Sequence, residues 1–168
     1  MIENELTEFN SFAHFTQKLN DLDRIKKDLK KGQLPQQIIN FSDETMHKLY
    51  EICLKLFEEK SFKDAANSFL FLATLNPHHA GYWLGLGMAT QMCHDYETAI
   101  DAYELAACLE IANPVPYFYL GKCYFAIHEL ENSLQALNLA IEIASEFEEY
   151  QELREQAETA KDLLLDHF

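Results

Sequence analysis

Apolar and small residues recur through the central part of this chain at a constant interval of 34 residues. Trp83, Leu86 and Gly87 are followed by the small residue Ala99 and then by Tyr103. The same pattern returns one interval later and one interval earlier, as Tyr117, Leu120, Gly121 and Leu137, and as Leu49, Ile52, Cys53, Ala65 and Phe69. Spacings of three and four positions place such side chains on one face of a helix, and we expect these residues to pack between the helices. The pattern therefore predicts three consecutive units, each a pair of antiparallel helices.

Local signals predict where these helices begin and end. Ser42 is a hydroxyl-bearing cap that precedes Asp43 and Glu44, two carboxylates suited to a first helical turn. The segment Asn113-Pro114-Val115-Pro116 separates the second unit from the third. We expect the helix pairs at about 43–59 and 62–75, 79–93 and 96–110, and 115–127 and 130–144.

The segment 1–41 does not follow this repeat. Its apolar residues, three or four positions apart, predict one amphipathic helix, which Lys30-Lys31-Gly32 ends and a connector from Pro35 to Phe41 follows. Two interpretations remain open, and both can hold. The apolar face packs on the first unit as a cap, or it is a self-association surface that makes a homodimer through Phe9, Phe12, Phe15, Leu19 and Leu22.

The spacing and residue types match the tetratricopeptide pattern, in which small residues stand where two helices approach. The expected fold is therefore all-α: a tetratricopeptide-repeat superhelix of three helix-turn-helix repeats, with an N-terminal helix and a C-terminal capping helix. The expected divisions are 1–41 for the N-terminal helix and connector, 42–145 for the repeats (46–79, 80–113 and 114–145), and 146–168 for the cap. The capping helix, over about 147–166, turns an acidic face to solvent.

Charge and cysteine usage narrow the classes of function. The formal net charge is −15, and no Lys or Arg occurs between Lys63 and Lys122. Nucleic acid and anionic membranes require a basic surface, so neither is an expected partner. The four cysteines contain no CxxC pair and fall inside helical patterns, which indicates buried, reduced thiols in a cytosolic protein. No apolar run has the length of a membrane span.

Stacked helix pairs form a superhelix whose concave wall is built by the first helix of each pair. Helical spacing predicts which side chains face this groove, and most of them are apolar. Aromatic and Met side chains suit the binding of an extended peptide, whereas a groove that clamps a carboxylate requires several bases. The alternative is that the chain itself, or a second copy, covers these residues. The candidate peptide-binding residues are His47, Tyr50, Leu54 and Phe57, then Leu84, Met88, Gln91 and Met92, then Phe118, Lys122 and Phe125.

No motif for catalysis, metal binding or cofactor binding is found. His78-His79 and Cys93-His94 are neighbours in turns, where adjacent side chains diverge, and the chain has no HExxH and no glycine-rich phosphate loop. We therefore expect no enzyme activity, no cofactor and no metal.

The whole arrangement resembles the class II chaperones of bacterial type III secretion. The resemblance rests on the segment from Phe41 to Tyr50, on Leu84-Gly85-Leu86-Gly87, on three repeats between two flanking helices, and on small size and acidity. It implies a bacterial, cytoplasmic, ATP-independent chaperone that holds an extended apolar segment of secreted translocator proteins in its groove. By the same resemblance, the N-terminal helix is associated with dimerisation. The runner-up function is a repeat scaffold that joins folded proteins.

Overall fold

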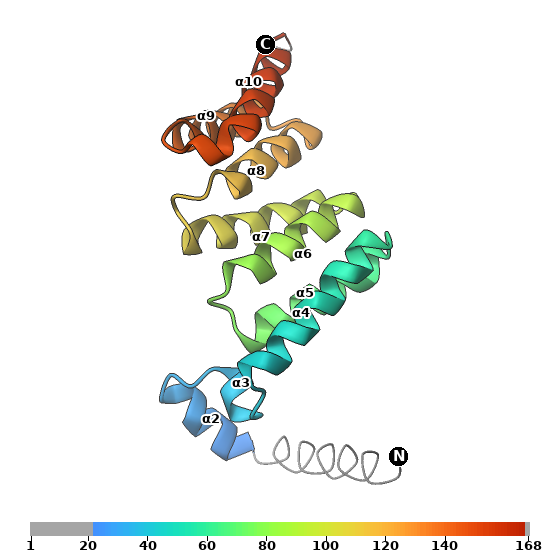
Figure 1. Ribbon diagram of the computed structural model, residues 1–168, viewed down its shortest axis with the longest axis vertical. Helices are drawn as coiled ribbons and strands as arrows, with labels where there is room; N and C mark the ends of the chain where they lie inside the picture. Colours follow the sequence, from blue (N-terminus) through green and yellow to red (C-terminus); the bar gives the residue numbers. More distant parts are fainter. Residues whose placement is uncertain (1–21, 167–168) are drawn as a thin grey trace.

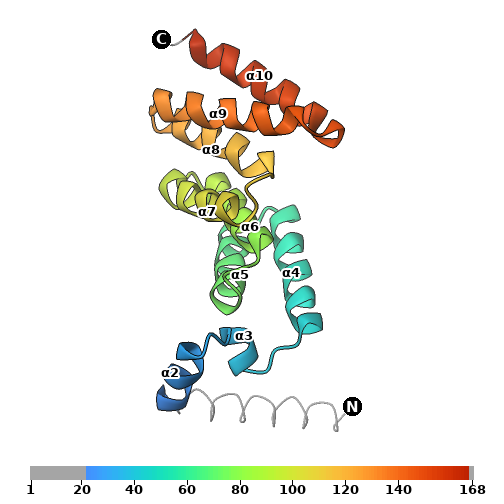
Figure 2. The same ribbon diagram turned by 90° about the vertical axis from the view of Figure 1, so that its left-hand side faces the viewer.

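The computed structural model describes residues 22–166, which form helices joined by turns, without a β-strand. Figures 1 and 2 show helix pairs that succeed one another along the long axis of the molecule. The elements are α2 (Leu22–Lys30), α3 (Pro35–Ile38), α4 (Asp43–Glu58), α5 (Phe62–Leu75), α6 (Ala80–Met92), α7 (Tyr96–Leu109), α8 (Pro114–Ala126), α9 (Leu130–Ser145), the 3₁₀ helix η1 (Glu148–Tyr150) and α10 (Gln151–Leu165).

The expected repeat fold is confirmed, with the pairs α4–α5, α6–α7 and α8–α9 stacked in order and α10 against α9. The predicted cap of the first pair is also present. The side-chain oxygen of Ser42 accepts a hydrogen bond from the backbone N–H of Thr45, at 3.1 Å. This bond satisfies one of the N–H groups that the first turn of a helix leaves without an internal partner.

The turn inside each pair repeats with the same period as the rest of the pattern. Lys60, His94 and His128 have φ values of 63°, 62° and 65°, in the left-handed region that usually favours glycine. The residue after each one donates its N–H to a carbonyl in the preceding helix: Ser61 to Leu56, Asp95 to Thr90 and Glu129 to Tyr124. This bond closes the end of the first helix, so all three pairs turn in the same way.

Small residues in the first helices allow the close approach that the sequence predicted. A Cβ added to Gly87 would lie 2.6 Å from Cε1 of Tyr103, and one added to Gly121 would lie 2.7 Å from Cγ of Leu137. Both are contacts between the two helices of one pair. Gly85 makes the contact between pairs, because a Cβ there would lie 2.4 Å from Cε1 of Phe69 in α5. Helix α6 is therefore held against a ring on each side.

The third repeat departs from the pattern without losing its packing. Ser133 stands where the other repeats have Ala65 and Ala99, and all three side chains are fully buried. The Ser133 hydroxyl donates a hydrogen bond to the carbonyl oxygen of Gly121, at 2.7 Å. Because this bond satisfies the hydroxyl, burial carries no unpaired polar group.

The structure corrects three details of the expected fold. Part of the connector between Pro35 and Phe41 is the short helix α3, and the C-terminal helix is preceded by the 3₁₀ turn η1, so that Phe147 lies outside it and is exposed. Ile52, expected to pack between helices, is instead exposed. The equivalent residues Leu86 and Leu120 are buried because a preceding second helix covers them, and no described helix does this for Ile52.

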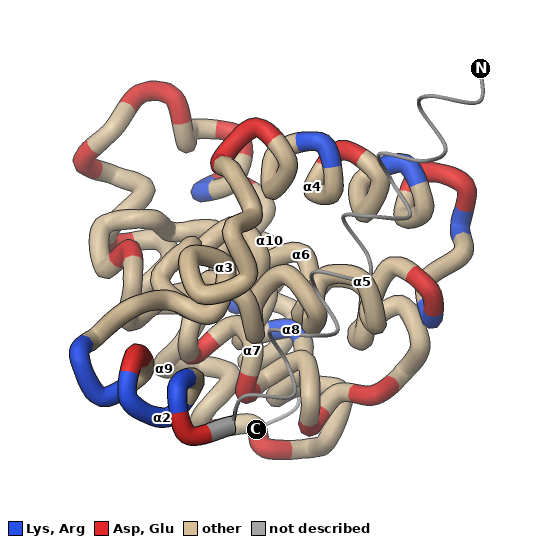
Figure 3. The backbone as a smooth tube through the Cα atoms, turned by 90° about the horizontal axis from the view of Figure 1, so that it is seen from below, with Lys and Arg blue, Asp and Glu red and all other residues tan. Residues whose placement is uncertain are grey.

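The charges are distributed unevenly over the described residues. Figure 3, seen from the α2 end, shows Lys and Arg gathered on α2 and further bases on α4, with acidic residues spread along the chain, α2 and α4 included. The carboxylate of Asp28 on α2 lies 3.7 Å from Nε of Arg24 and 3.0 Å from Nζ of Lys31. The hydrogen bond from Lys31 is the main reason that the pKa of the Asp28 carboxyl is lowered. Helix α2 therefore has a charge character opposite to that of the repeats.

The packing of Gly85 against Phe69 predicts that Gly85→Ala destabilises the protein. Alanine favours a helix by up to about 1 kcal/mol over glycine, but overpacking a tight contact costs about 1–3 kcal/mol. We expect a lower urea midpoint, measured by circular dichroism. Gly81→Ala is the matched control, because its nearest neighbours, at 3.0 to 3.2 Å, are tips of the His79 and Tyr50 side chains. A Gly85→Ala midpoint equal to or above that of the unchanged protein would contradict the tight contact.

Candidate functional site

Each first helix of the three pairs exposes one large apolar side chain from the predicted groove set. Leu54 on α4 is 41% exposed, Met92 on α6 is 50% exposed and Phe125 on α8 is 42% exposed. A side chain with this exposure keeps much of its apolar surface in contact with water. Three such residues, one per repeat, give a ligand apolar contacts along the length of the array.

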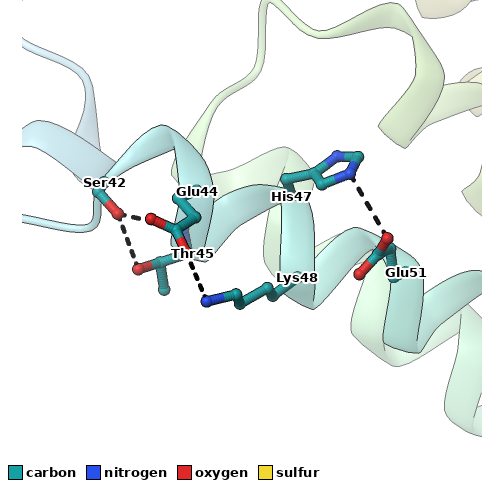
Figure 4. Close-up of polar contacts among 6 residues, drawn as sticks. All are labelled: Ser42, Glu44, Thr45, His47, Lys48 and Glu51. Atoms are coloured by element: carbon teal, nitrogen blue, oxygen red, sulfur yellow. Dashed lines mark hydrogen bonds and ion pairs between the residues drawn. The ribbon is translucent and has the colours of Figure 1, made fainter.

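The first turns of α4 carry exposed polar side chains, among them the predicted groove residue His47 (Figure 4). His47 is exposed, and its Nε2 lies 3.5 Å from Oε1 of Glu51 one turn further along the same helix. Nζ of Lys48 likewise lies 2.6 Å from Oε1 of Glu44, one turn earlier on the same helix. These pairs run along the surface of α4, so His47 borders the apolar residues and is not enclosed by them.

Tyr50 lies in an aromatic cluster that joins the first pair of helices to the second. Its ring centroid is 6.0 Å from that of Phe69 and 5.4 Å from that of Tyr82, and His79 stacks on Tyr82 at 4.0 Å. Tyr50 is half-buried, and burial raises the pKa of its phenol. The cluster therefore fixes the Tyr50 ring and leaves part of it accessible. Phe57, also half-buried, packs edge to face on Phe62, at 5.2 Å.

Three of the four predicted residues of the second repeat are half-buried, and only Met92 is exposed. Leu84 and Met88 are half-buried, and both pack on the core shared by the second and third pairs. Gln91 accepts a hydrogen bond from the hydroxyl of Tyr103, at 2.7 Å. Tyr103 itself is fully buried, and desolvation strongly raises the pKa of its phenol, so the group remains a donor. Gln91 is thereby held in place by a core residue of α7.

The third repeat differs from the expectation at Phe118. This residue was expected to face the groove, but it is only 7% exposed and packs with Leu137 and with Ala157 and Leu164 of α10. The reason is the C-terminal helix, which covers the part of α8 that an additional repeat would otherwise cover. Lys122 lies beside Phe118, and its Nζ is 5.3 Å from the centroid of the Phe118 ring, a cation–π distance.

Two separate hollows bring predicted residues together. One places His47 and Tyr50 beside Gln36, Asp43, His79 and Tyr82, and it has a polar lining. The other is an apolar hollow of about 200 Å³ formed by α8, α9 and α10, where Lys122 and Phe125 meet Leu137, Ala160, Leu163 and Leu164. The candidate site is therefore an extended surface with local pockets, and its two ends differ in polarity.

Sequence reasoning missed an apolar trough on the second helices. It lies between α7 and α9 and has Tyr117 and Tyr124 of α8 at its base, with exposed residues at its rim. Leu139 lines this trough, and its equivalents in the other repeats, Phe71 and Leu105, are also apolar and exposed, so the repeat period is the signal that could have indicated an apolar surface on the second helices. Of the five residues predicted for dimerisation, Phe9, Phe12, Phe15 and Leu19 lie outside the described residues, as does the side chain of Leu22 on α2.

Within residues 22–166 no group of three or more His, Cys, Asp or Glu side chains is placed to hold a metal ion. None of the helices in this range combines the length and apolar character that crossing a bilayer would need. Burial raises the pKa of the Cys53 and Cys123 thiols to about 11, so both resist forming the reactive thiolate.

The class of protein that these observations define is a tetratricopeptide-type helical repeat whose first helices expose apolar side chains. No known protein-family model matches the chain. The low calcium response locus protein H of Yersinia pestis is 28% identical over 125 residues, which cover 74% of each chain.

Two solved structures share the fold of this chain. The type III secretion chaperone SycD of Yersinia enterocolitica, in complex with a peptide of the translocator YopD, is 26% identical with a TM-score of 0.71, covering 73% of this chain and 94% of SycD. A chain in a type III secretion complex from Aeromonas hydrophila shares the fold with a TM-score of 0.81, at 23% identity and with 86% and 97% coverage. The resemblance to the class II translocator chaperones of type III secretion, recognised in the sequence, is confirmed.

The burial of the thiols predicts a division among the four cysteines. The expectation of four buried thiols is wrong for Cys93 and Cys108, which are exposed. Cys53 and Cys123 are buried, with thiolate fractions of about one in a thousand at pH 8. An aromatic disulfide reagent should react within minutes with two thiols of the native protein, and with four in guanidinium chloride. Cys93→Ser with Cys108→Ser is the control, which should leave no rapid phase. A rapid third thiol would show that the core around Cys53 or Cys123 opens.

Proposed function

We propose that this protein is a cytosolic, ATP-independent chaperone of type III secretion translocators. It binds an extended apolar segment of its client across the first helices α4, α6 and α8, and it keeps that client soluble until export. The observation that carries the proposal is the exposure of Leu54, Met92 and Phe125, one on the first helix of each repeat. These three residues supply apolar surface on each of the three first helices, which supports binding of one extended segment across the repeats.

The likeness to chaperones of known partners supports the choice of ligand. SycD, whose fold this chain shares over most of its length, is known in complex with a peptide of the translocator YopD. A peptide bound along a repeat array contacts several repeats at once, which agrees with one exposed residue in each. The polar hollow at His47 and the apolar hollow at Phe125 then contact opposite ends of the bound segment.

A moderate number of apolar contacts suits a holding function. Binding to the chaperone lowers the free concentration of an aggregation-prone client by mass action, without any energy source. The client must also be released for export, so its affinity cannot come from a large sealed interface. Small pockets and half-buried rings such as Tyr50 and Phe57 supply contacts of this intermediate kind.

The relatives are chaperones, and their role is a non-enzymatic one. We extend this absence of catalysis to the present chain, whose described residues offer no cluster of metal ligands. The second candidate function, a scaffold for folded proteins, is favoured by the apolar trough on α7 and α9, which lies outside the peptide-binding set. A chaperone captures a short client peptide, whereas a scaffold requires folded partners.

The proposal predicts that Leu54→Asp combined with Met92→Asp abolishes client binding. Both side chains are exposed, so the variant should remain folded, while two buried carboxylates would weaken a peptide complex by at least about tenfold each. The client is first recovered from the native cell with the tagged protein and identified by mass spectrometry. Fluorescence anisotropy with peptides tiling that client then measures affinity.

The matched control is Leu105→Asp with Leu139→Asp. These residues have similar exposure but lie on the second helices α7 and α9. The control should bind client peptide with unchanged affinity. Equal loss in both variants would assign binding to a surface other than the first helices, and capture of folded partners without any peptide binding would support the scaffold.

Client binding should depend weakly on salt. The predicted set contains the single lysine Lys122, which already lies over the Phe118 ring, so apolar contacts dominate. Raising the salt concentration from about 0.05 to 0.5 M shortens the screening length severalfold, and we expect a change in Kd of less than about threefold. A Kd that rises by more than tenfold in this series would instead indicate charge pairing as the main source of affinity.

A further inference from the structure

The apolar trough on the second helices has two regular walls. It encloses about 590 Å³ between α7 and α9, with α8 at its base. The wall on α7 and the turn after it uses the helical positions i, i+3, i+4 and i+7, which are Glu104, Ala107, Cys108 and Ile111. The wall on α9 has the same spacing and runs from Asn132 to Leu139. Each wall is therefore a stripe of two helical turns, about 10 Å long, of the kind with which helices pack on one another.

Large apolar side chains at the rim of this trough are exposed to water. Ile111 is 72% exposed, more than any other large apolar residue in the described range, and Leu139 is 44% exposed. One repeat earlier, Trp83 stands at the position of Tyr117, and its Nε1–H donates a hydrogen bond to the carbonyl oxygen of Pro77, at 2.8 Å. Pro77 is the equivalent of Ile111. The Trp83 ring thus reaches the turn after α5, whereas Tyr117 lines an open trough beside the uncovered Ile111.

No basic side chain lines the trough. Over residues 64–153, the only Lys or Arg is Lys122. Lys122 belongs to the separate hollow formed by α8, α9 and α10, and the two hollows have no residue in common. A cationic ligand in the trough therefore meets no like charge from its walls.

Carboxylates lie at both ends of the trough. Glu104 is part of the α7 wall, and its Oε1 accepts a hydrogen bond from the Tyr124 hydroxyl, at 2.8 Å. Burial is the main cause that raises the pKa of Tyr124 to about 12, and the carboxylates of Glu104, Glu129 and Asp101 raise it further. This end therefore has three carboxylates around one hydroxyl. At the opposite end, Glu110 caps the C-terminus of α7.

We propose that this trough is the docking site of a basic amphipathic helix of a partner protein. The apolar stripe of that helix packs between Ile111 and Leu139, and its Lys and Arg side chains face the carboxylates at the two ends. A helix fits because both walls already have helical spacing, and a basic helix fits because the walls carry a carboxylate and no cation. The trough shares no residue with the peptide-binding set on the first helices, so this partner is separate from the client segment bound there.

The first test uses two synthetic peptides of about 18 residues, long enough to form a helix on binding. One has Leu at helical spacings of three and four and Lys elsewhere, and the matched peptide has Glu at every Lys position. Fluorescence anisotropy with the full-length protein, at about 0.05 M salt, should show the Leu/Lys peptide binding at least about tenfold more tightly. Its Kd should rise by more than about tenfold at about 0.5 M salt. Equal affinities of the two peptides would overturn the proposal.

Cys108 reports directly on occupation of the trough. It is exposed and lies in the α7 wall, whereas Cys93 is exposed but does not line the trough. Saturating Leu/Lys peptide should slow the alkylation of Cys108 by a maleimide by at least about tenfold and leave the rate at Cys93 unchanged, as followed by mass spectrometry of digests. Equal rates at Cys108 with and without peptide would place the peptide elsewhere and overturn the assignment.

Variants that keep the charge separate docking from a general attraction between a basic peptide and this acidic protein. Ile111→Gln with Leu139→Gln makes the rim polar and should weaken binding of the Leu/Lys peptide by at least about tenfold. All substituted side chains are exposed, so circular dichroism should show an unchanged Tm. The matched control is Leu70→Gln with Leu163→Gln, on α5 and α10, outside the trough. The control should bind as the unchanged protein does, and equal affinities of the two variants would show a non-specific attraction.

Two further measurements identify the occupant. Saturating client peptide should leave the Kd of the Leu/Lys peptide unchanged, and displacement would place both in one site and overturn the proposal. Light scattering should give the same mass for the unchanged protein and for Ile111→Gln with Leu139→Gln. A mass that falls in this variant would assign the trough to a second copy, whose α2 is basic, and would also overturn the proposal. The peptide probes do not depend on the client, so a failure of client binding leaves these results intact.

Discussion

The close contact between a small residue on one helix and a ring or branched side chain on its neighbour determines this architecture. Gly87 with Tyr103 and Gly121 with Leu137 set the distance within a pair, and Gly85 with Phe69 sets the distance between pairs. A side chain at any of these glycines would meet another at 2.4 to 2.7 Å, well inside van der Waals contact. The orientation of α6 and α8 follows from these contacts, and so does the surface that each of them exposes.

This packing explains why part of the candidate site could be predicted from the sequence and part could not. Helix positions, the Ser42 cap and the identity of the repeat depend on local spacing and on pairs such as Gly87 and Tyr103, whose separation along the chain recurs in each repeat. A single sequence reveals such signals. The burial of Phe118 depends on α10, whose docking is a tertiary event with no local signature. Tyr50 and Phe118 occupy equivalent positions of the first and third repeats, yet Tyr50 is half-buried and Phe118 is buried, because α10 covers only the latter.

The same reasoning applies at the other end of the repeats. Ile52 was expected in the core because its position in the pattern is a core position, and that rule is correct for Leu86 and Leu120. The rule assumes a preceding repeat. At the first repeat this assumption fails, so the pattern predicts which residue type occupies the position but not what covers it.

Selection for a core residue at an end position is itself informative. An isoleucine that always faced water would gain nothing over a polar side chain, whereas an isoleucine under a packed helix contributes about 1.5–3 kcal/mol. The chain keeps apolar residues at equivalent positions of the first, second and third repeats, although only the second and third have a described neighbour to bury them. The repeat pattern therefore determines the residue type at this position in all three repeats, whether or not a described neighbour buries it.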